Sequence, residues 1–224
     1  MPARLRPTAP IAPDAILVGD PGQALLLAQE LLEEPKMSNH ARGLWGYSGR
    51  TAAGRTLTIQ STGMGGPSAA LVLSDLAKLG VRRAVRVGTC AGFAGACALG
   101  ELLVVTEAIA AGGSAGALGV SLGAAVLPDA KLTERLAEAL GEEGRRAAVA
   151  SFDAHPGEQS PRGGTVAADM QTAPLLARAR SLGIEAAAVL IVSEKEDEKE
   201  RLEVEALAKA EKRAGHAASV VLSG

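Results

Sequence analysis

Apolar positions along the chain alternate between short continuous runs and stretches with helical spacing. Continuous apolar or β-branched runs predict strands, and the spacing i, i+3, i+4 predicts helices that bury one face. Strands are expected at Ala15–Val18, Gly43–Ser48, Thr56–Ser61, Ala84–Val87, Leu102–Ala108, Ala147–Ala150 and Ala187–Val192. Helices are expected at Ala24–Leu32, from Pro67 through Leu79, around Leu132–Leu140, at Met170–Leu182 and in a last amphipathic segment ending near His216.

This alternation of strands and helices is typical of an α/β protein. The run Ala187–Val192 is apolar at every position, as expected for a strand covered on both faces. The charged run Glu194–Glu205 is interpreted as a solvated helix face. No linker or repeat divides the chain, so residues 1–224 are expected to form a single three-layer α/β/α domain with a mixed, mainly parallel central sheet.

Composition excludes several classes of partner. The 224 residues suit one domain, and 23 Lys plus Arg against 25 Asp plus Glu give a net charge of −2. This balance gives no electrostatic reason to expect nucleic acid or a membrane surface as a partner. Phe93, Phe152, Trp45 and Tyr47 are the only aromatic residues, too few for a base-stacking platform.

Targeting and metal signals are also absent from the sequence. Prolines interrupt the N-terminal residues, so no signal peptide is visible, and the glycine-rich stretch Ala108–Pro128 is interpreted as a strand end plus loop. Cys90 and Cys97 form neither a disulfide framework nor a zinc spacing. We therefore expect a cytoplasmic protein without a metal.

Three glycine-containing turns follow predicted strands, at Gly19–Gly22, Thr62–Ser68 and Gly88–Cys90. Ligands of open α/β sheets bind beyond the carboxyl ends of the strands, and backbone N–H groups at helix N-termini attract anions. Arg86 adds a cation next to the third turn. None of the turns is a Walker or Rossmann fingerprint. Each turn taken alone is better explained by a plain change of chain direction, but the three together with an arginine favour an anion site at this edge of the sheet.

Six segments stand in order along the chain: VGDPGQA, ARGLWGYSG, STGMGGPSAALVLSDL, VRVGTC, AADMQTA and LIVSE. Together they resemble the nucleoside phosphorylase family, in the branch that holds uridine phosphorylases and hexameric purine nucleoside phosphorylases. The resemblance extends from about Pro7 to Ser219. Within Ser61–Leu76 the sequence departs from the family signature only at Leu71 and Asp75.

The resemblance implies phosphorolysis of the N-glycosidic bond of a nucleoside, giving free base and ribose 1-phosphate. Inorganic phosphate is then the co-substrate, with no organic cofactor. The implied assembly is a homo-hexamer, a trimer of dimers, in which Arg42 is shared across the dimer interface. The implied phosphate-binding positions are Gly19, Gln23, Arg42, Arg86 and Thr89. The implied nucleoside-binding positions are Met64, Cys90, Ala91, Phe152, Asp169, Met170 and Gln171. The implied catalytic residues are Arg86, Thr89, Gln171 and Glu194.

Three positions depart from the family pattern. Gln23 replaces an arginine of the phosphate site, and Gln171 replaces the glutamate that binds the ribose hydroxyls. A neutral hydrogen bond is about half as strong as a charge-assisted one. Glu194 stands where purine enzymes carry an aspartate that protonates the base.

The base preference inferred from the resemblance leans toward uridine. The pair Gly65-Gly66 before Pro67 suits uridine phosphorylases, which also lack the acid at the position of Glu194. However, Gln159 and Arg162 follow Phe152 in the reverse order of a uracil-reading Gln-x-Arg pair. A purine is therefore the alternative base.

Other functions remain as alternatives. Gln23 and Gln171 together suit a family member that binds a nucleoside with weak or no turnover, and a nucleosidase would not need an arginine at position 23. The segment GGSAG also fits the G-x-S-x-G elbow of serine hydrolases, with Ser114 as nucleophile and His155 or His216 as base.

Overall fold

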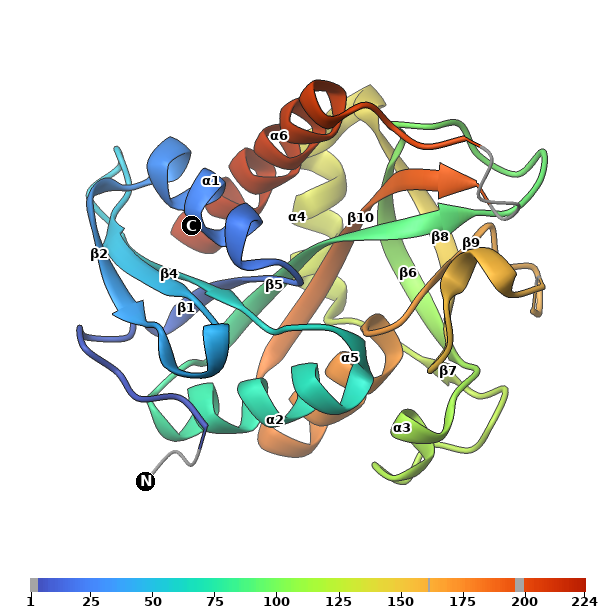
Figure 1. Cartoon of the computed structure of the whole chain (residues 1–224), viewed down its shortest axis with the longest axis horizontal. Coiled ribbons are helices and arrows are strands. Elements are labelled where there is room, and N and C mark those ends of the chain that lie inside the picture. Colours follow the sequence, from blue (N-terminus) through green and yellow to red (C-terminus); the bar gives the residue numbers. More distant parts are fainter. Residues whose placement is uncertain (1–3, 161, 196–199) are drawn as a thin grey trace.

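A mixed sheet with helices on both faces forms the protein (Figure 1). The computed structural model describes residues 4–160, 162–195 and 200–224. The strands are β1 (Asp14–Val18), β2 (Glu33–Asn39), β3 (Gly46–Arg50), β4 (Thr56–Ser61), β5 (Arg83–Gly92), β6 (Leu102–Ala110), β7 (Ala125–Val126), β8 (Gly144–Ser151), β9 (Ala167–Asp169) and β10 (Glu185–Lys195). The α-helices are α1 (Pro21–Leu31), α2 (Gly65–Lys78), α3 (Gly113–Gly116), α4 (Ala130–Leu140), α5 (Thr172–Leu182) and α6 (Val204–Ser223).

The sheet closes on itself at one end. Its strand order is β10-β6-β8-β9-β5-β1-β4-β3-β2, and β10 additionally pairs with β5 along almost its whole length. Strands β5, β10, β6, β8 and β9 therefore form a ring, from which β1, β4, β3 and β2 extend. Strands β4, β1, β5 and β10 run parallel to one another, so their carboxyl ends lie at one edge of the sheet.

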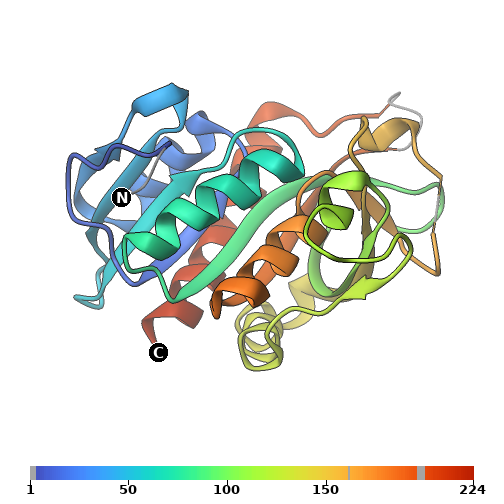
Figure 2. The same ribbon diagram turned by 90° about the horizontal axis from the view of Figure 1, so that it is seen from below.

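Two layers of helices cover the sheet, which confirms the expected three-layer α/β/α fold. Helices α1, α4 and α6 pack on one face, and α2 and α5 pack on the other (Figures 1 and 2). Each face has its own apolar core. Leu73, Leu76 and Leu175 belong to the core under α2 and α5, and Leu27, Leu136 and Ala218 to the core under α1, α4 and α6.

The segment Gly88–Cys90 is not a turn, contrary to the expectation from its sequence. It continues strand β5, because Leu190, Ile191 and Val192 of β10 stand opposite Gly88, Thr89 and Cys90 in a parallel ladder. The ladder satisfies the backbone hydrogen bonds of the segment and keeps it extended. Thr89 and Cys90 consequently point to opposite faces of the sheet, and Thr89 is exposed whereas Cys90 is buried.

Two further expectations are corrected at the C-terminal end. The charged run Glu194–Glu205 is not one helix face: β10 extends to Lys195, α6 begins at Val204, and residues 196–199 lie outside the described residues. Helix α6 also continues past His216 to Ser223. Its last turns bury Val221 and Leu222 on the sheet, which an apolar face at helical spacing explains.

Strand β2 was not expected, because its sequence EEPKMSN is polar and contains a proline. It is the outermost strand of the sheet and pairs with β3 through an irregular register between Glu33 and Lys36. Glu34 within this irregular part has a positive φ of 46°. Prolines and bulges are typical of edge strands, where one side of the backbone needs no partner strand.

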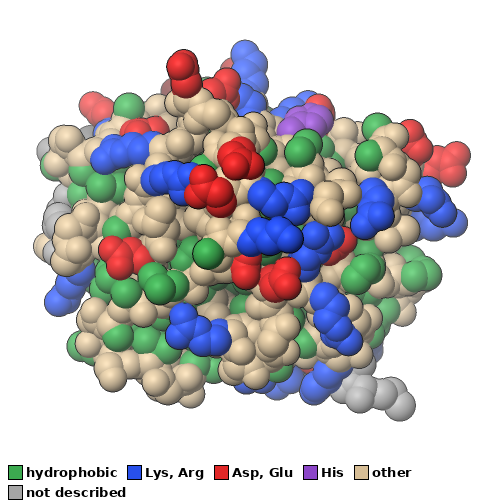
Figure 3. Space-filling view, turned by 180° about the vertical axis from the view of Figure 1, so that it is seen from behind, with side chains coloured by type: hydrophobic (Ala, Val, Ile, Leu, Met, Phe, Trp, Pro, Cys, Tyr) green, Lys and Arg blue, Asp and Glu red, His purple; other side chains and the backbone are tan. Residues whose placement is uncertain are grey.

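Charged side chains are mixed on the surface. On the face shown in Figure 3, basic side chains are bordered by acidic ones and neither sign forms a continuous field. Among the described residues, no helix is both long and apolar enough to cross a membrane.

Candidate active site

The first two glycine turns meet at the carboxyl ends of β1 and β4. The Thr62 N–H donates to the Val18 carbonyl at 2.7 Å, so the chain leaving β4 runs beside the end of β1. A side chain added at Gly19 would lie 4.0 Å from the Gly63 carbonyl oxygen. Gly63 itself has a φ of 73°, which favours glycine, and Leu44 and Ser68 crowd its open side. These two turns therefore lie side by side at the carboxyl edge of the sheet.

Arg86 reaches this junction from β5 and is almost fully buried. Its guanidinium folds back over Gly88, where an added Cβ would lie 2.5 Å from the Arg86 Cζ. Only glycine at position 88 leaves room for this path. Arg86 donates from Nη1 to Gln171 Oε1 at 2.7 Å and from Nη2 to an Asp169 carboxylate oxygen at 3.1 Å. Arg86 is therefore held by Asp169, the last residue of β9, and by Gln171, which directly precedes α5.

Gln171 connects the two sides of the junction. Its side chain is 4% exposed, its Oε1 accepts from Arg86, and its Nε2 donates to the Gly63 carbonyl. The amide thus ties β5 to the turn between β4 and α2. Both ends of the Gln171 amide are engaged within the protein, which leaves only limited hydrogen-bonding capacity for a ligand hydroxyl.

Helix α1 begins at the same edge of the sheet with an unused donor. Asp20 caps the helix by accepting from the N–H groups of Gly22 and Gln23 at 2.7 and 3.1 Å. The Gln23 side chain is 6% exposed, and its Nε2 has no hydrogen-bond partner among the described residues. A buried amide without an acceptor is unfavourable, so this group fits an oxyanion or water at the helix N-terminus.

The floor beyond Arg86 is apolar. Cys90 and Ala91 are buried, and Phe152 packs in a small cluster with Phe93 and Ala168. Burial, and secondarily the Asp169 carboxylate, raises the pKa of the Cys90 thiol well above its ordinary value. Cys90 is therefore a neutral lining residue and not a thiolate nucleophile.

Glu194 is the penultimate residue of β10, at the same edge of the sheet, opposite Ala91 in the register. Its side chain is 16% exposed and lies near an arginine and a histidine. Arg201 Nη2 is 3.5 Å from one carboxylate oxygen, and His155 Nε2 is 3.9 Å from the other. Glu194 is the one predicted site carboxyl that stays partly accessible.

Three other predicted residues are exposed or half-buried. Met64 caps α2 and is 88% exposed, and Arg42 lies exposed in the short 3-10 turn η1 (Ala41–Gly43) with a φ of 61°. Leu44, two residues later, touches the Gly63 position, so η1 borders the site. Met170 is half-buried between the engaged Asp169 and Gln171.

The sequence interpretation missed the hydroxyl groups of the site. Thr62, Ser151 and Thr172 are all buried and all bond to Asp169 or Gln171. Ser151 is the last residue of β8, one position past the expected strand, and Thr172 directly follows Gln171. These hydroxyl residues stand at the ends of strands or at the start of a helix, where ligands of α/β sheets bind, and this position could have marked them as site residues.

Ser114 does not have the surroundings of a serine nucleophile. Its N–H donates to the Asp153 carboxylate at 2.9 Å, and its hydroxyl bonds to the same carboxylate. His216 lies on α6, 3.0 Å from Glu30, and His155 lies near Glu194. Helix α3, which contains Ser114, has four residues. The partner of the Ser114 hydroxyl is therefore a carboxylate.

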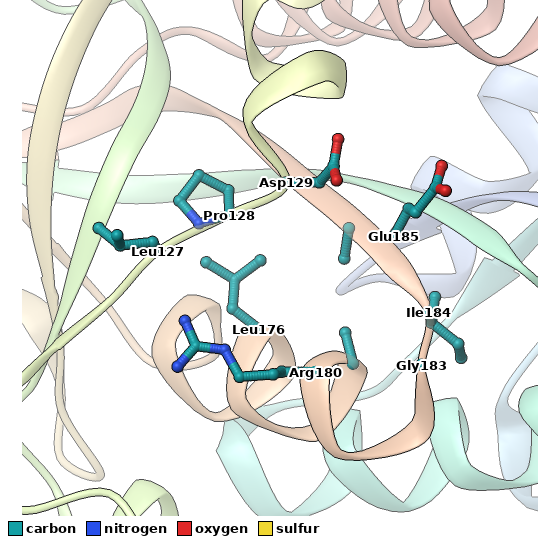
Figure 4. A pocket seen from close by; sticks show the side chains of 10 residues that line it. Leu127, Pro128, Asp129, Leu176, Arg180, Gly183, Ile184 and Glu185 are labelled. Atoms are coloured by element: carbon teal, nitrogen blue, oxygen red, sulfur yellow. The ribbon is translucent and has the colours of Figure 1, made fainter.

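Two hollows of the surface lie away from this cluster. One of about 250 Å³ lies beside the end of α5 and the amino end of β10, with Leu127, Leu176 and Arg180 in its lining (Figure 4). The other, about 870 Å³, lies between residues 9–13 and strands β2, β3 and β4. The first is at the opposite end of β10 from Glu194, so it cannot belong to the same site.

Comparison with known proteins identifies the family. The Phosphorylase superfamily profile matches residues 13–223. The chain belongs to this superfamily. Nearly all the elements described above, and every predicted site residue, lie inside the matched range.

The relatives of this superfamily member are nucleoside phosphorylases. A purine nucleoside phosphorylase DeoD-type from Oceanobacillus iheyensis is 43% identical over 81 residues, which are 36% of this chain and 34% of that enzyme. Another from Clostridium perfringens (strain SM101) is 29% identical over 194 residues, 82% of each chain. The crystal structure of uridine phosphorylase from Vibrio fischeri ES114 matches with a TM-score of 0.82 at 22% identity, over 95% of this chain and 92% of that one. The resemblance to nucleoside phosphorylases and their fold is confirmed.

Proposed function

We propose that this protein cleaves nucleosides by phosphorolysis. An oxygen of inorganic phosphate attacks the anomeric carbon, the C–N bond breaks with its electron pair moving to the base, and the base takes up a proton. The products are free base and ribose 1-phosphate. The observation that carries the proposal is the junction of the Gly19 and Gly63 turns with buried Arg86 at the carboxyl edge of the sheet.

Phosphate is assigned to the α1 side of this junction. The unused amide of Gln23, the backbone at Gly19, the exposed hydroxyl of Thr89 and the remaining N–H groups of Arg86 supply donors. Hydrogen-bond donors fixed before the reaction stabilise charge that develops in the transition state. The nucleoside is assigned to Met64, Cys90, Ala91, Phe152, Met170 and Gln171. Arg42 is assigned to the site of a neighbouring subunit in a homo-hexamer, a trimer of dimers.

The identity of the base is the finer part of the proposal. The preference for uridine stays a prediction. Glu194 favours a purine instead, because a partly accessible carboxyl opposite Ala91 suits protonation of a departing purine. The DeoD-type relatives carry purine in their names. A cytoplasmic location likewise stays a prediction.

A binding role without efficient turnover is the second candidate. It is supported by Gln171, whose amide is engaged by Arg86 and the Gly63 carbonyl and carries no charge for the ribose hydroxyls. Arg86 is also already paired with Asp169, which reduces the positive charge offered to a phosphate dianion.

One assay separates these functions. The purified protein is incubated with inosine, adenosine, uridine and thymidine, with and without phosphate, and free base is measured. Phosphate-dependent release supports the proposal, phosphate-independent release supports a nucleosidase, and binding without release supports the second candidate. Thr89→Val should lower phosphate-dependent release about 10-fold or more by removing one donor, whereas Thr106→Val, on β6, should not. Glu194→Gln should lower purine release selectively.

A further inference from the structure

The Asp169 carboxylate is the most heavily hydrogen-bonded side chain of the site. The residue is 1% exposed. One carboxylate oxygen accepts from Arg86 Nη2 at 3.1 Å, Gln171 N at 3.1 Å, Thr172 N at 3.0 Å and Thr172 Oγ1 at 2.6 Å. The other accepts from Ser151 Oγ at 2.5 Å and from Thr172 N at 3.3 Å. This number of donors leaves no room on the carboxylate for a ribose hydroxyl.

These donors come from three separate elements. Arg86 belongs to β5, Ser151 ends β8, and the N–H groups of Gln171 and Thr172 open helix α5. Ser151 Oγ also accepts from Ala173 N at 2.8 Å. Asp169, directly and through Ser151, therefore caps three N–H groups at the start of α5. The positive end of the helix dipole favours a carboxylate at this place.

The same contacts fix the direction of the Arg86 guanidinium. Nη2 is held by Asp169, Nη1 by Gln171, and Nε donates to Thr172 Oγ1 at 3.3 Å. Thr172 Oγ1 in turn donates its own proton to Asp169. Three of the five N–H groups of Arg86 are thus used, and the other two have no acceptor among the described residues.

We infer that Asp169 is a positioning residue that aims Arg86 and does not contact the nucleoside. It acts through Arg86: the carboxylate and the α5 N-terminus lock one edge of the guanidinium, and the free N–H groups are left to an oxyanion. This inference rests on the proposed function only in taking phosphate as that oxyanion. A fixed guanidinium loses less rotational freedom when it binds an anion than a mobile one does.

The test compares Asp169→Asn with a matched control, Ser151→Ala. Both variants weaken the capping of α5, but only Asp169→Asn removes the negative charge that is paired with Arg86. The dissociation constant of inorganic phosphate is measured by calorimetry on the full chain. We expect Asp169→Asn to weaken phosphate binding about 10-fold or more, and Ser151→Ala to change it less than about twofold. Equal weakening by both variants, or no weakening by Asp169→Asn, would overturn the inference.

A second readout does not depend on phosphate. In the ¹⁵N NMR spectrum of arginine-labelled protein, the Arg86 Nε–H is assigned by its loss in Arg86→Lys. It should exchange slowly with water in the wild type and in Ser151→Ala, and quickly in Asp169→Asn. If the wild type binds no phosphate, the proposed phosphorolysis fails while this exchange rate still decides the positioning role.

If Asp169→Asn does not fold, Thr172→Val tests the same inference. This variant keeps the size of the side chain and the carboxylate but removes the hydroxyl that bridges Arg86 Nε and Asp169. Faster exchange of the Arg86 Nε–H and weaker phosphate binding are expected again, smaller than for Asp169→Asn. Thr133→Val, whose buried hydroxyl bonds within α4, is its control. An Arg86 signal unchanged from wild type in Thr172→Val would count against the inference.

Discussion

At the scale of single residues, the two hydrogen bonds of the Gln171 amide explain why this position suits a glutamine. Its oxygen needs a donor and finds Arg86, and its nitrogen needs an acceptor and finds the Gly63 carbonyl. A glutamate at this position would satisfy Arg86 but would set a carboxylate oxygen against the Gly63 carbonyl. The neutral residue is therefore suited to this arrangement, whatever the ribose requires.

This geometry predicts a pH-dependent loss of stability in Gln171→Glu. At pH 8 the ionised side chain should lower the free energy of unfolding by about 1–3 kcal/mol, the usual effect of leaving a buried acceptor without its donor. Part of the loss should be regained toward pH 5, because a protonated carboxyl donates to Gly63. Urea denaturation at both values measures the effect, with the exposed Gln29→Glu as control. Equal stability of Gln171→Glu and wild type at pH 8 would contradict this account.

At the scale of elements, α1 and α6 bring two carboxyl groups together. The helices pack on the same face of the sheet, and Asp20 at the start of α1 faces Glu211 of α6. Burial, with a smaller contribution from the Asp20 charge, raises the pKa of Glu211 to about 7. The folded state therefore favours protonated Glu211. Its stabilisation is complete below the ordinary pKa near 4.5 and is lost as the pH rises through 7.

Glu211→Gln should remove this pH dependence. The amide mimics the protonated carboxyl, so the variant should melt above the wild type at pH 8 and close to it at pH 5. Melting temperatures across this range measure the difference. The same change at exposed Glu138 of α4 should have little effect at either pH. A pH-independent difference between Glu211→Gln and wild type would show that the Glu211 charge is not the cause.

The elements also show what the sequence can predict. Helical spacing located α1, α2, α4 and α5, because each has one apolar face against the sheet. Strand β2 could not be predicted from the sequence, because its residues, which include Glu, Pro and Lys, do not alternate between apolar and polar. The extension of β5 through Thr89 depends on its neighbour β10, which no local pattern reveals. In the site, the resemblance supplied Arg86 and Gln171, but the bond from Gln171 to Gly63 depends on residues 108 positions apart.

At the scale of the whole molecule, the position of Arg42 requires a second copy for its proposed role. It is exposed in η1 beside the Gly63 turn. If Arg42 completes a neighbour's site, Arg42→Ala and Thr89→Val should each be nearly inactive alone. A dimer with one copy of each variant still holds one complete site. In that site Thr89 comes from the Arg42→Ala copy and Arg42 comes from the Thr89→Val copy.

Mixing the two variants tests this arrangement. Random exchange of equal amounts should restore about a quarter of wild-type phosphate-dependent release, because half of the pairs are hybrid and each has one intact site. Native mass spectrometry of differently tagged copies confirms that exchange has occurred. Hybrid pairs without recovered activity would place Arg42 outside the neighbour's site. Wild type mixed with Thr89→Val serves as the control for exchange alone.

The closed ring of β5, β10, β6, β8 and β9 has a consequence for solubility. A closed ring has no free strand edges, so β2 is the long strand whose outer side stays open among the described elements. Residues near Thr8 cover its second half through a bond from Thr8 N to the Ser38 carbonyl at 2.9 Å. The uncovered half consists of Glu33, Glu34, Pro35 and Lys36, with a bulge and a proline that cannot donate. Charge, bulge and proline together oppose edge-to-edge pairing of β2 with a strand of another molecule, which protects the chain against aggregation.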